Sequence, residues 1–500
     1  MSDCTAIELM QNAKWDGCKD TPPTTCKPDW FPGHNFTHTV AETALVSLTS
    51  GTDNNCGPFY GTWLNYLVQN GSVPEALLDT AVTRVYRTAL LLGLLDAACP
   101  FWALNRTSVD TPAHRALALR AARESLVLLK NNGALLPLSA STKLAFIGPY
   151  ANATQQFLSN YHGDNLLVNS GSPLQTALAR NLPVTYARGC NICDEVPSGF
   201  PNMPCTKSGD ASGIPAAAAA AAAADVAVLF VGLDQTSEAE NFDRNGLGLP
   251  GAQDALIAAV VAANPRTVLV VVGGGPVSAP LAYSAAASVL HAGYGGQAGG
   301  AAIVDALTGA TSPAGKLPFT IYYNSITARD IRDVDLAHNG GITHMYFEGP
   351  VVFPFGAGLT GYTRFAFSVV APAAGAAATP LRVSRAQLRR AVARTPFPVG
   401  ALTVRVKNVG PVVGDAVVLV MVRRRRGPRA PSATAPVQAL VDFTRVRTVA
   451  PGEEVVHTFE LTMGVVFGAF RGEQGAYDAP VGEYELLVEG NVALSFNVAA

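Results

Sequence analysis

The sequence predicts a multidomain protein, α/β followed by all-β, in which a mostly parallel sheet precedes a β-sandwich. Hydrophobic residues make up 49% of the 500 residues and charged residues only 14%, a balance that supplies large buried cores. Between about residues 112 and 330, short apolar runs alternate with helical segments, which is the pattern of βαβ units. After about residue 380, apolar residues recur at every second position between turn residues, as they do in a β-sandwich.

Two helices and a linker are expected in the first 111 residues. A short helix near residues 39–49 places its apolar side chains on one face. A longer helix begins at a capping box formed by Ser72 and Glu75 and ends at Gly93. Residues 99–111 have no clear periodicity and are interpreted as a linker.

The α/β domain is expected at residues 112–330. Its first helix is capped by Thr111 and runs to about Lys130. The alanine tract at 215–224 predicts a helix packed on a sheet, because alanine is the best helix former. Six consecutive apolar residues at 226–231 predict a central parallel strand that is covered on both faces. Further strands are expected at 143–147, 268–272 and 288–291, and further helices at 251–263 and 298–308.

The all-β domain is expected at residues 380–500, after an Ala/Pro-rich stretch. Its apolar residues alternate, which predicts strands with one buried face. The alternating sets are Leu402, Val404 and Val406; Val418, Val420 and Val422; Val455, His457, Phe459 and Leu461; and Tyr484, Leu486 and Val488.

A cluster of carboxylates follows the central strand. Glu238, Glu240 and Asp243 lie within six positions of one another, just beyond Gly232, and ligands of open α/β sheets bind past the carboxyl ends of strands. Crowded carboxylates raise the pKa of at least one member, as a general acid requires. A structural alternative is that Asp243 pairs with Arg244 to fix the loop while both glutamates face water. The loop alone favours this alternative.

Two other motifs have structural interpretations. Gly273-Gly274-Gly275 lacks the Lys-Ser/Thr of a phosphate-binding loop and predicts a close approach of the backbone at the sheet edge. Cys190-x-x-Cys193 has no second pair at ligand spacing, so a disulfide that staples a surface loop is expected there in preference to zinc. No set of potential ligands has convincing metal spacing, and no metal is expected.

Composition and modification signals favour a secreted protein. A net charge of -2 gives no reason to expect nucleic acid or an anionic membrane as a partner. No apolar run is long enough to span a membrane, and no signal peptide follows Met1. Sequons at Asn35, Asn105 and Asn152, with eight cysteines, predict a glycosylated protein of the extracellular space or cell wall whose targeting segment is missing.

Ordered motifs extend over almost the whole chain. They are Ser2-Asp3-Cys4-x-Ala6-Ile7, Gly51-Thr52-Asp53-x-x-Cys56-Gly57, Ile147-Gly148-Pro149, Asn160-Tyr161-x-Gly163, Glu238-Ala239-Glu240-x-x-Asp243-Arg244, Gly248-Leu249-Pro250-Gly251, Gly293-Tyr294-Gly295-Gly296-Gln297, Pro313-Ala314-Gly315-Lys316-Leu317-Pro318 and Pro354-Phe355-Gly356-x-Gly358-Leu359. Together they resemble glycoside hydrolase family 3, and within it the β-xylosidase / α-L-arabinofuranosidase branch.

The resemblance implies a retaining, exo-acting glycosidase without a cofactor, most simply a β-D-xylosidase acting on xylan-derived oligosaccharides. Asp3 would be the nucleophile. Glu240, three positions before Asp243-Arg244, would be the acid/base, with Glu238 as the alternative. Two such carboxyl groups lie about 5–5.5 Å apart in retaining enzymes. A β-glucosidase or N-acetylglucosaminidase of the same family remains an alternative, as does a carbohydrate-binding or structural remnant without activity.

The resemblance also implies three domains. Residues 1–98 would be the remnant of a (β/α)₈ barrel and 112–330 the family's α/β sandwich. Residues 331–379 would be a connector, and 380–500 a fibronectin type III-like domain. A complete barrel needs about 250 residues, so the first segment is expected to hold one or two βα units and to expose apolar surface. The chain is therefore expected to be a truncated form in which little holds Asp3 in place.

Overall fold

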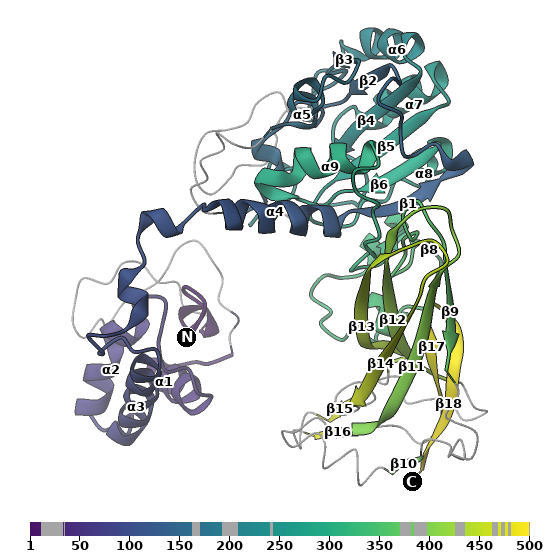
Figure 1. Ribbon diagram of the computed structural model, residues 1–500. Helices are drawn as coiled ribbons and strands as arrows, with labels where there is room; N and C mark the ends of the chain where they lie inside the picture. The colour runs from purple at the N-terminus through teal and green to yellow at the C-terminus, as the bar shows by residue number, and fades with distance from the viewer. Residues whose placement is uncertain are drawn as a thin grey trace. The chain divides into compact units, whose positions relative to one another are not determined.

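The computed structural model describes residues 1–11, 34, 36–162, 171–192, 209–240, 244–370, 382–384, 398–425, 436–462, 469–471, 476–478 and 482–499. The chain divides into two compact units, Met1–Asp110 and Thr111–Ala500. Each unit is described by itself (Figure 1).

The first unit is built from short helices around a small core. Its helices are α1 (Val40–Thr49), α2 (Phe59–Gln69) and α3 (Glu75–Leu91). Phe59, Trp63 and Leu67 of α2 pack against Ala44 and Leu48 of α1. Among the described residues of this unit, the strand pairing is limited to one parallel bridge between Gln11 and Thr37. The expected βα units are therefore present as helices with almost no sheet.

Two details of this unit differ from the prediction. Helix α2 was not foreseen, and the capping box of α3 is wrong, because the N-cap is Pro74 and its side chain makes no capping bond. Ser72 lies two residues too early to cap this helix. Val73 would have to be helical in the predicted box, but a residue before proline is pushed towards an extended conformation.

Helix α3 exposes much of its apolar side, as expected for this segment. Ala81 is buried, whereas Val82, Val85, Tyr86 and Leu90 are exposed. The following turn continues this surface, and Leu91 is 79% exposed.

The second unit contains a six-stranded sheet in the order β1-β6-β5-β4-β2-β3. All neighbours are parallel except β1 and β6. The strands are β1 (Val127–Asn131), β2 (Leu144–Ile147), β3 (Val184–Ala187), β4 (Val226–Gly232), β5 (Thr267–Val272) and β6 (Ser288–His291). The mostly parallel α/β sheet is thus confirmed, with β4 near its centre.

Helices cover both faces of this sheet (Figure 1). They are α4 (Pro112–Ser125), α5 (Pro173–Ala179), α6 (Ile214–Ala223), α7 (Gln253–Ala263), α8 (Pro280–Ala285) and α9 (Gly299–Leu307). Strand β4 shows why both faces must be covered. Val226, Val228 and Phe230 join the core beneath α5 and α9, and the alternate residues, such as Leu229 and Val231, join the core beneath α6 and α7.

Helix α4 is shorter than predicted. It ends at Ser125, and residues 127–131 form β1 instead of a last helical turn. Leu126 to Leu129 are four consecutive buried apolar residues. Such a run fits a buried strand as well as a buried helix, and here it pairs with β6. The alanine tract does form a helix, α6.

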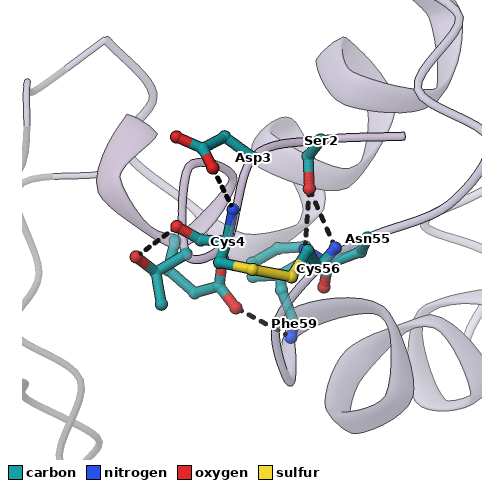
Figure 2. The surroundings of a disulfide bond; sticks show 8 residues. Ser2, Asp3, Cys4, Asn55, Cys56 and Phe59 are labelled. Atoms are coloured by element: carbon teal, nitrogen blue, oxygen red, sulfur yellow. Dashed lines mark hydrogen bonds between the residues drawn. A yellow bond between two sulfur atoms is a disulfide. The ribbon is translucent and has the colours of Figure 1, made fainter. Parts of the chain in front are cut away.

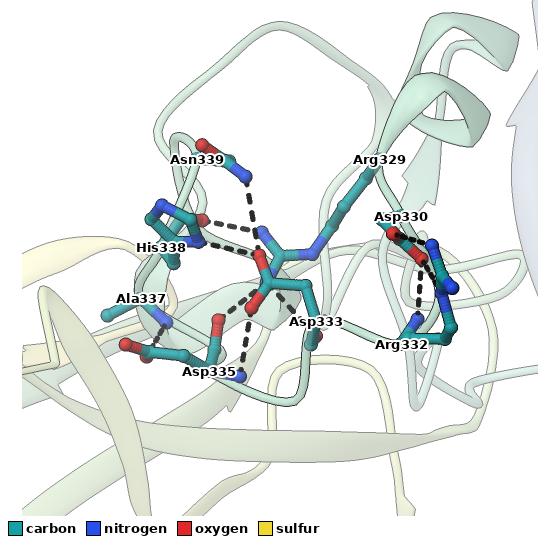
Figure 3. A network of polar contacts seen from close by, with 8 residues as sticks. All are labelled: Arg329, Asp330, Arg332, Asp333, Asp335, Ala337, His338 and Asn339. Carbon is teal, nitrogen blue, oxygen red and sulfur yellow. Dashed lines mark hydrogen bonds and ion pairs between the residues drawn. The ribbon is translucent and has the colours of Figure 1, made fainter.

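A segment of small elements follows the sheet: β7 (Ile321–Tyr322), α10 (Thr343–Tyr346) and β8 (Val351–Phe353). Between β7 and α10, an acidic loop folds around Arg329 (Figure 3). The guanidinium pairs with Asp333 at 3.1 Å and donates to the carbonyls of Asp335 and His338. An arginine thus occupies the centre of this cluster. Among the described residues, no group of three His, Cys, Asp or Glu is arranged to hold a metal ion.

The chain ends in two sheets that face each other. One has the order β10-β18-β17-β12-β13 and the other β14-β11-β9, with a separate β15-β16 pair. Their bounds are β9 (Phe365–Val369), β10 (Arg382–Ser384), β11 (Pro398–Asn408), β12 (Gly414–Arg424), β13 (Gln438–Val449), β14 (Glu454–Thr462), β15 (Ala469–Arg471), β16 (Ala476–Asp478), β17 (Gly482–Val488) and β18 (Asn491–Ala499). The alternating residues predicted to face inward, such as Val404, Val420 and Leu486, form the buried core, which confirms the β-sandwich.

Ion pairs connect the sandwich to the α/β sheet. Glu124 lies 3.0 Å from Arg447, and the carbonyl of Glu124 accepts a hydrogen bond from Arg445. Lys316 pairs with Glu489 at 3.1 Å and is only 9% exposed. Over the described part of the chain, no helix is long and apolar enough to cross a membrane.

Candidate active site

The carboxylate loop starts where β4 leaves the sheet. Gly232 has φ +148°, and a Cβ there would lie 1.7 Å from the carbonyl oxygen of Val272 on β5. Only glycine fits so close to the neighbouring strand. The amide of Leu233 still donates to that carbonyl at 2.8 Å, and the chain then turns over the carboxyl edge of the sheet, as the sequence predicts.

A tight turn at Asp234 directs the next residues. Its Oδ1 accepts hydrogen bonds from the amide and the hydroxyl of Thr236, at 3.0 and 2.5 Å. Its carbonyl accepts from the amides of Ser237 and Glu238, both at 2.9 Å. The Asp234 side chain is buried, and this burial raises its pKa. The turn returns the chain towards the sheet and fixes the position of the Glu238 backbone.

Glu238 reaches back onto the ends of two neighbouring strands. Its Oε1 accepts from the hydroxyl of Tyr294 and the amide of Gly274, both at 2.7 Å, and from the amide of Gly275 at 3.4 Å. Its Oε2 lies 3.7 Å from Nε of Arg244. The structural alternative in which both glutamates face water is therefore wrong for Glu238, because backbone amides at the sheet edge supply its partners.

Glu240 has different surroundings. It is exposed, and its amide donates to Oδ1 of Asn160 at 3.0 Å. Asp243, the proposed partner of Arg244, lies outside the described residues. Arg244 instead donates to the carbonyl of Pro276 at 2.9 Å, besides its pair with Glu238. Of the two candidate acids, one is bound to the sheet edge and the other faces solvent.

The triple glycine forms the surface on which Glu238 rests. A Cβ on Gly274 would lie 2.9 Å from the ring of Tyr294 and 3.3 Å from Glu238 Oε1. A Cβ on Gly275 would lie 2.8 Å from Arg244 and 3.0 Å from Glu238 Oε2. The predicted close approach at the sheet edge is confirmed, and the group that approaches is a carboxylate of the chain itself.

Two tyrosines near this loop were not predicted. Tyr294 lies just past β6 and bonds Glu238, and burial, followed by the charge of Glu238, raises its pKa. Tyr150 is fully buried past β2, and within the described part of the chain its hydroxyl has no hydrogen-bond partner. Burial raises its pKa well above the usual value. Both residues follow strands, so the carboxyl-edge rule applied to every strand would have found them.

Asp3 lies in the first unit, and the chain around it is fastened more firmly than expected (Figure 2). A disulfide joins Cys4 to Cys56. The amides of Ser2 and Thr5 donate to the carbonyls of Asn54 and Cys56, at 2.9 and 2.7 Å. The Ser2 hydroxyl accepts from the amide of Cys56 at 3.0 Å. The expectation that little holds this segment is wrong.

The Asp3 carboxylate itself is exposed, and its Oδ1 accepts from the amide of Cys4 at 2.8 Å. Asp3 and Glu240 belong to different units, each described by itself. Their predicted separation of about 5–5.5 Å therefore stays a prediction.

The remaining cysteine and sequon predictions have mixed outcomes. Cys190 carries a free, buried thiol whose pKa is raised to about 11 by burial, so its predicted disulfide is wrong. Cys193 and Asn35 lie outside the described residues, as does Cys205. Asn105 and Asn152 are exposed, and their glycosylation stays a prediction.

Two family models match the chain. The glycosyl hydrolase family 3 C-terminal domain matches residues 126–361, and a fibronectin type III-like domain matches residues 417–492. These matches cover the six-stranded sheet with its carboxylate loop and part of the β-sandwich.

Similar proteins include xylosidases of fungi and plants. The chain is 35% identical over 492 residues to a probable exo-1,4-beta-xylosidase bxlB of Aspergillus fumigatus, covering 96% of this chain and 60% of that protein. It is 36% identical over 350 residues to beta-D-xylosidase 1 of Arabidopsis thaliana, covering 68% of this chain and 43% of that protein.

A solved structure, a GH3 exo-beta-xylosidase (XlnD) in complex with a xylobiose aziridine activity-based probe, aligns with a TM-score of 0.79 and 28% identity. The alignment covers 100% of this chain and 60% of that chain. The chain thus spans about 60% of the length of the fungal relative and of this structural neighbour.

Proposed function

Because the chain belongs to glycoside hydrolase family 3, we propose that it supplies both catalytic carboxylates of a retaining, exo-acting β-D-xylosidase. The observation that carries the proposal is the exposed Glu240, presented by a loop at the carboxyl edge of a parallel sheet. Substrates are oligosaccharides derived from xylan, and the names of the relatives support this class. Release of terminal α-L-arabinofuranosyl groups is a second activity of the same site.

The reaction uses the two carboxylates in sequence. Asp3 attacks the anomeric carbon of the terminal xylose and forms a covalent glycosyl-enzyme. Glu240 donates a proton to the departing glycosidic oxygen in the same step. Glu240 then removes a proton from water, and this water attacks the glycosyl-enzyme from the leaving-group side, so the product keeps the β configuration. No cofactor takes part in these steps.

The part of the relatives that this chain does not match would complete the sugar-binding site. A (β/α)₈ barrel would supply the sugar contacts around Asp3, and a chain without it would bind no xylose. We propose that the protein is secreted and N-glycosylated and acts in the extracellular space or cell wall. The spacing of its cysteines and sequons supports this location.

The test compares two proteins: the chain alone, and the chain joined to the unmatched part of the Aspergillus fumigatus relative. The joined protein should hydrolyse 4-nitrophenyl β-xyloside, and the chain alone should not. Asp3→Asn in the joined protein should lower kcat/KM at least about a thousandfold, because it removes the covalent route. Turnover that is insensitive to Asp3→Asn would contradict the proposal. Faster hydrolysis of β-glucosides than of β-xylosides would assign a different sugar.

A further inference from the structure

We infer that Glu238 is a positioning residue that anchors the loop of residues 233–240 on the ends of β5 and β6, so that the proton is transferred by Glu240. The inference rests on the proposed function and deepens it. It decides between two glutamates that the sequence leaves equivalent, and it gives the triple glycine a role in the enzyme.

One carboxylate gathers donors from two different strand ends. Oε1 of Glu238 is 2.7 Å from both the Tyr294 hydroxyl, past β6, and the Gly274 amide, past β5. Arg244 lies on the other oxygen, at 3.7 Å. Hydrogen bonds to an ionised group are about twice as strong as neutral ones. The loop is thereby fixed to the ends of two buried strands.

The anchor depends on the absence of side chains at the strand end. A β-carbon at Gly274 or Gly275 would fall within 3.3 Å of the Glu238 carboxylate. The exposed backbone amides of these glycines take the place that side-chain donors would otherwise fill. The motif is thus a binding surface for the chain's own glutamate.

Tyr294 strengthens this assignment. Its burial and the neighbouring carboxylate raise the pKa of its phenol, so the hydroxyl stays protonated and continues to donate to Glu238. An oxygen that already accepts from Tyr294 and Gly274 faces the protein, not a sugar. Glu238 is therefore oriented to accept hydrogen bonds from the sheet edge.

A general acid needs a side chain that can reach the substrate, and Glu240 has one whereas Glu238 does not. Its side chain is exposed, and among the described residues its backbone amide is held by Asn160. Two residues span at most about 7 Å, so fixing Glu238 confines Glu240 to a small region beyond the sheet edge. Asp234 holds the other end of the turn, since its carbonyl accepts from the Glu238 amide at 2.9 Å.

The first experiment measures amide hydrogen exchange by mass spectrometry in the 500-residue chain, over peptides that cover residues 233–240. Glu238→Ala should accelerate exchange there at least about tenfold, because hydrogen bonds to a charged group are lost. Glu238→Gln keeps an accepting oxygen but loses the charge, so it should accelerate exchange less than Glu238→Ala. Glu240→Gln, an isosteric change in the same loop, is the matched control and should have no effect. Unchanged exchange in Glu238→Ala would overturn the anchor.

The second experiment measures hydrolysis by the joined protein of two β-xylosides, one with a good and one with a poor leaving group. Glu238→Gln should retain most of the activity on both. Glu238→Ala should lose activity mainly on the poor leaving group, because Glu240 is displaced. Equal losses on both substrates with a lower Tm would mean that Glu238 only stabilises the fold. A loss in Glu238→Gln that falls mainly on the poor leaving group would make Glu238 the acid. If Asp3→Asn is harmless, the proposed function fails, while the exchange result still decides the anchor.

Discussion

The two candidate catalytic carboxylates are held in different ways. The segment around Asp3 is tied to residues 54–56 by a disulfide and by backbone hydrogen bonds, on a unit with a small core. The loop before Glu240 is held without covalent bonds, by Glu238 resting on glycines at the edge of a sheet whose central strands are buried. Non-covalent anchoring suffices where the supporting strands are buried. A covalent tie replaces it in the first unit, whose described residues contain a single β-bridge.

Removal of the disulfide should produce the largest effect. The bond closes a loop of 52 residues, for which chain entropy predicts a loss of about 4 kcal/mol in the unfolding free energy of the first unit. Cys4→Ser with Cys56→Ser should therefore lower the first thermal transition, as measured by calorimetry. The transition of the second unit should not move. A shift of both transitions would contradict the claim that the disulfide stabilises the first unit alone.

Acid should weaken the second unit through His291. Burial lowers the pKa of this histidine to about 4, and on unfolding it would return to about 6.5. As pH falls from about 6.5 to 4, the unfolded state takes up the proton first. The unfolding free energy should then drop by up to about 3 kcal/mol and stay constant above pH 7.

His291→Leu removes the titrating ring and keeps an apolar contact for Phe319, whose ring lies 5.7 Å from the imidazole. Urea titrations of wild type and variant at several pH values measure the difference. A wild-type chain that loses no more stability than the variant over this range would show that His291 plays no part.

A methyl group on the sheet edge should disturb the non-covalent anchor. Gly274→Ala places a Cβ 2.9 Å from the Tyr294 ring, and such overpacking costs about 1–3 kcal/mol. Gly248→Ala is the matched control, because a Cβ there would lie more than 4 Å from the atoms of the described residues. Denaturant unfolding should show a lower stability for Gly274→Ala only. Amide exchange in residues 233–240 should also be faster in that variant. Equal stability of the two variants would show that the close contact at Gly274 does not contribute to stability.

The smallest effect is expected at the surface of the first unit. Arg84 pairs with Asp53 at 3.0 Å, but the arginine side chain is 53% exposed. Exposed pairs contribute less than about 1 kcal/mol, and less still in salt. Arg84→Ala should hardly change the thermal midpoint of this unit. A loss comparable to that of the disulfide variant would mean that ion pairs, not the covalent tie, support the segment near Asp3.

Much of the second unit could be predicted from the sequence because its patterns are unambiguous. The unbroken apolar run of β4 and the alternation around Val404 and Val420 each admit one structure. The end of α4 could not be placed in this way. Residues 126–129 satisfy either a buried helix or a buried strand, and only pairing with β6 decides between them.

The candidate site was predicted as a cluster but not as an arrangement. The sequence places Glu238 and Glu240 in one loop, and nothing in their spacing says which of them turns back to the sheet. That choice depends on the turn at Asp234 and on Tyr294, more than 50 residues further along the chain. The tie between Cys4 and Cys56 likewise depends on a fold in which distant segments meet.

The most direct test of the central claim is azide rescue of the two isosteric variants in the joined protein. Without a general base, the glycosyl-enzyme of an activated xyloside persists, and azide can attack it without proton removal. Glu240→Gln should therefore lose about 10²–10⁴-fold in rate, regain it with azide and yield β-xylosyl azide. Glu238→Gln should form no such product. Azide product from Glu238→Gln, and none from Glu240→Gln, would contradict the assignment.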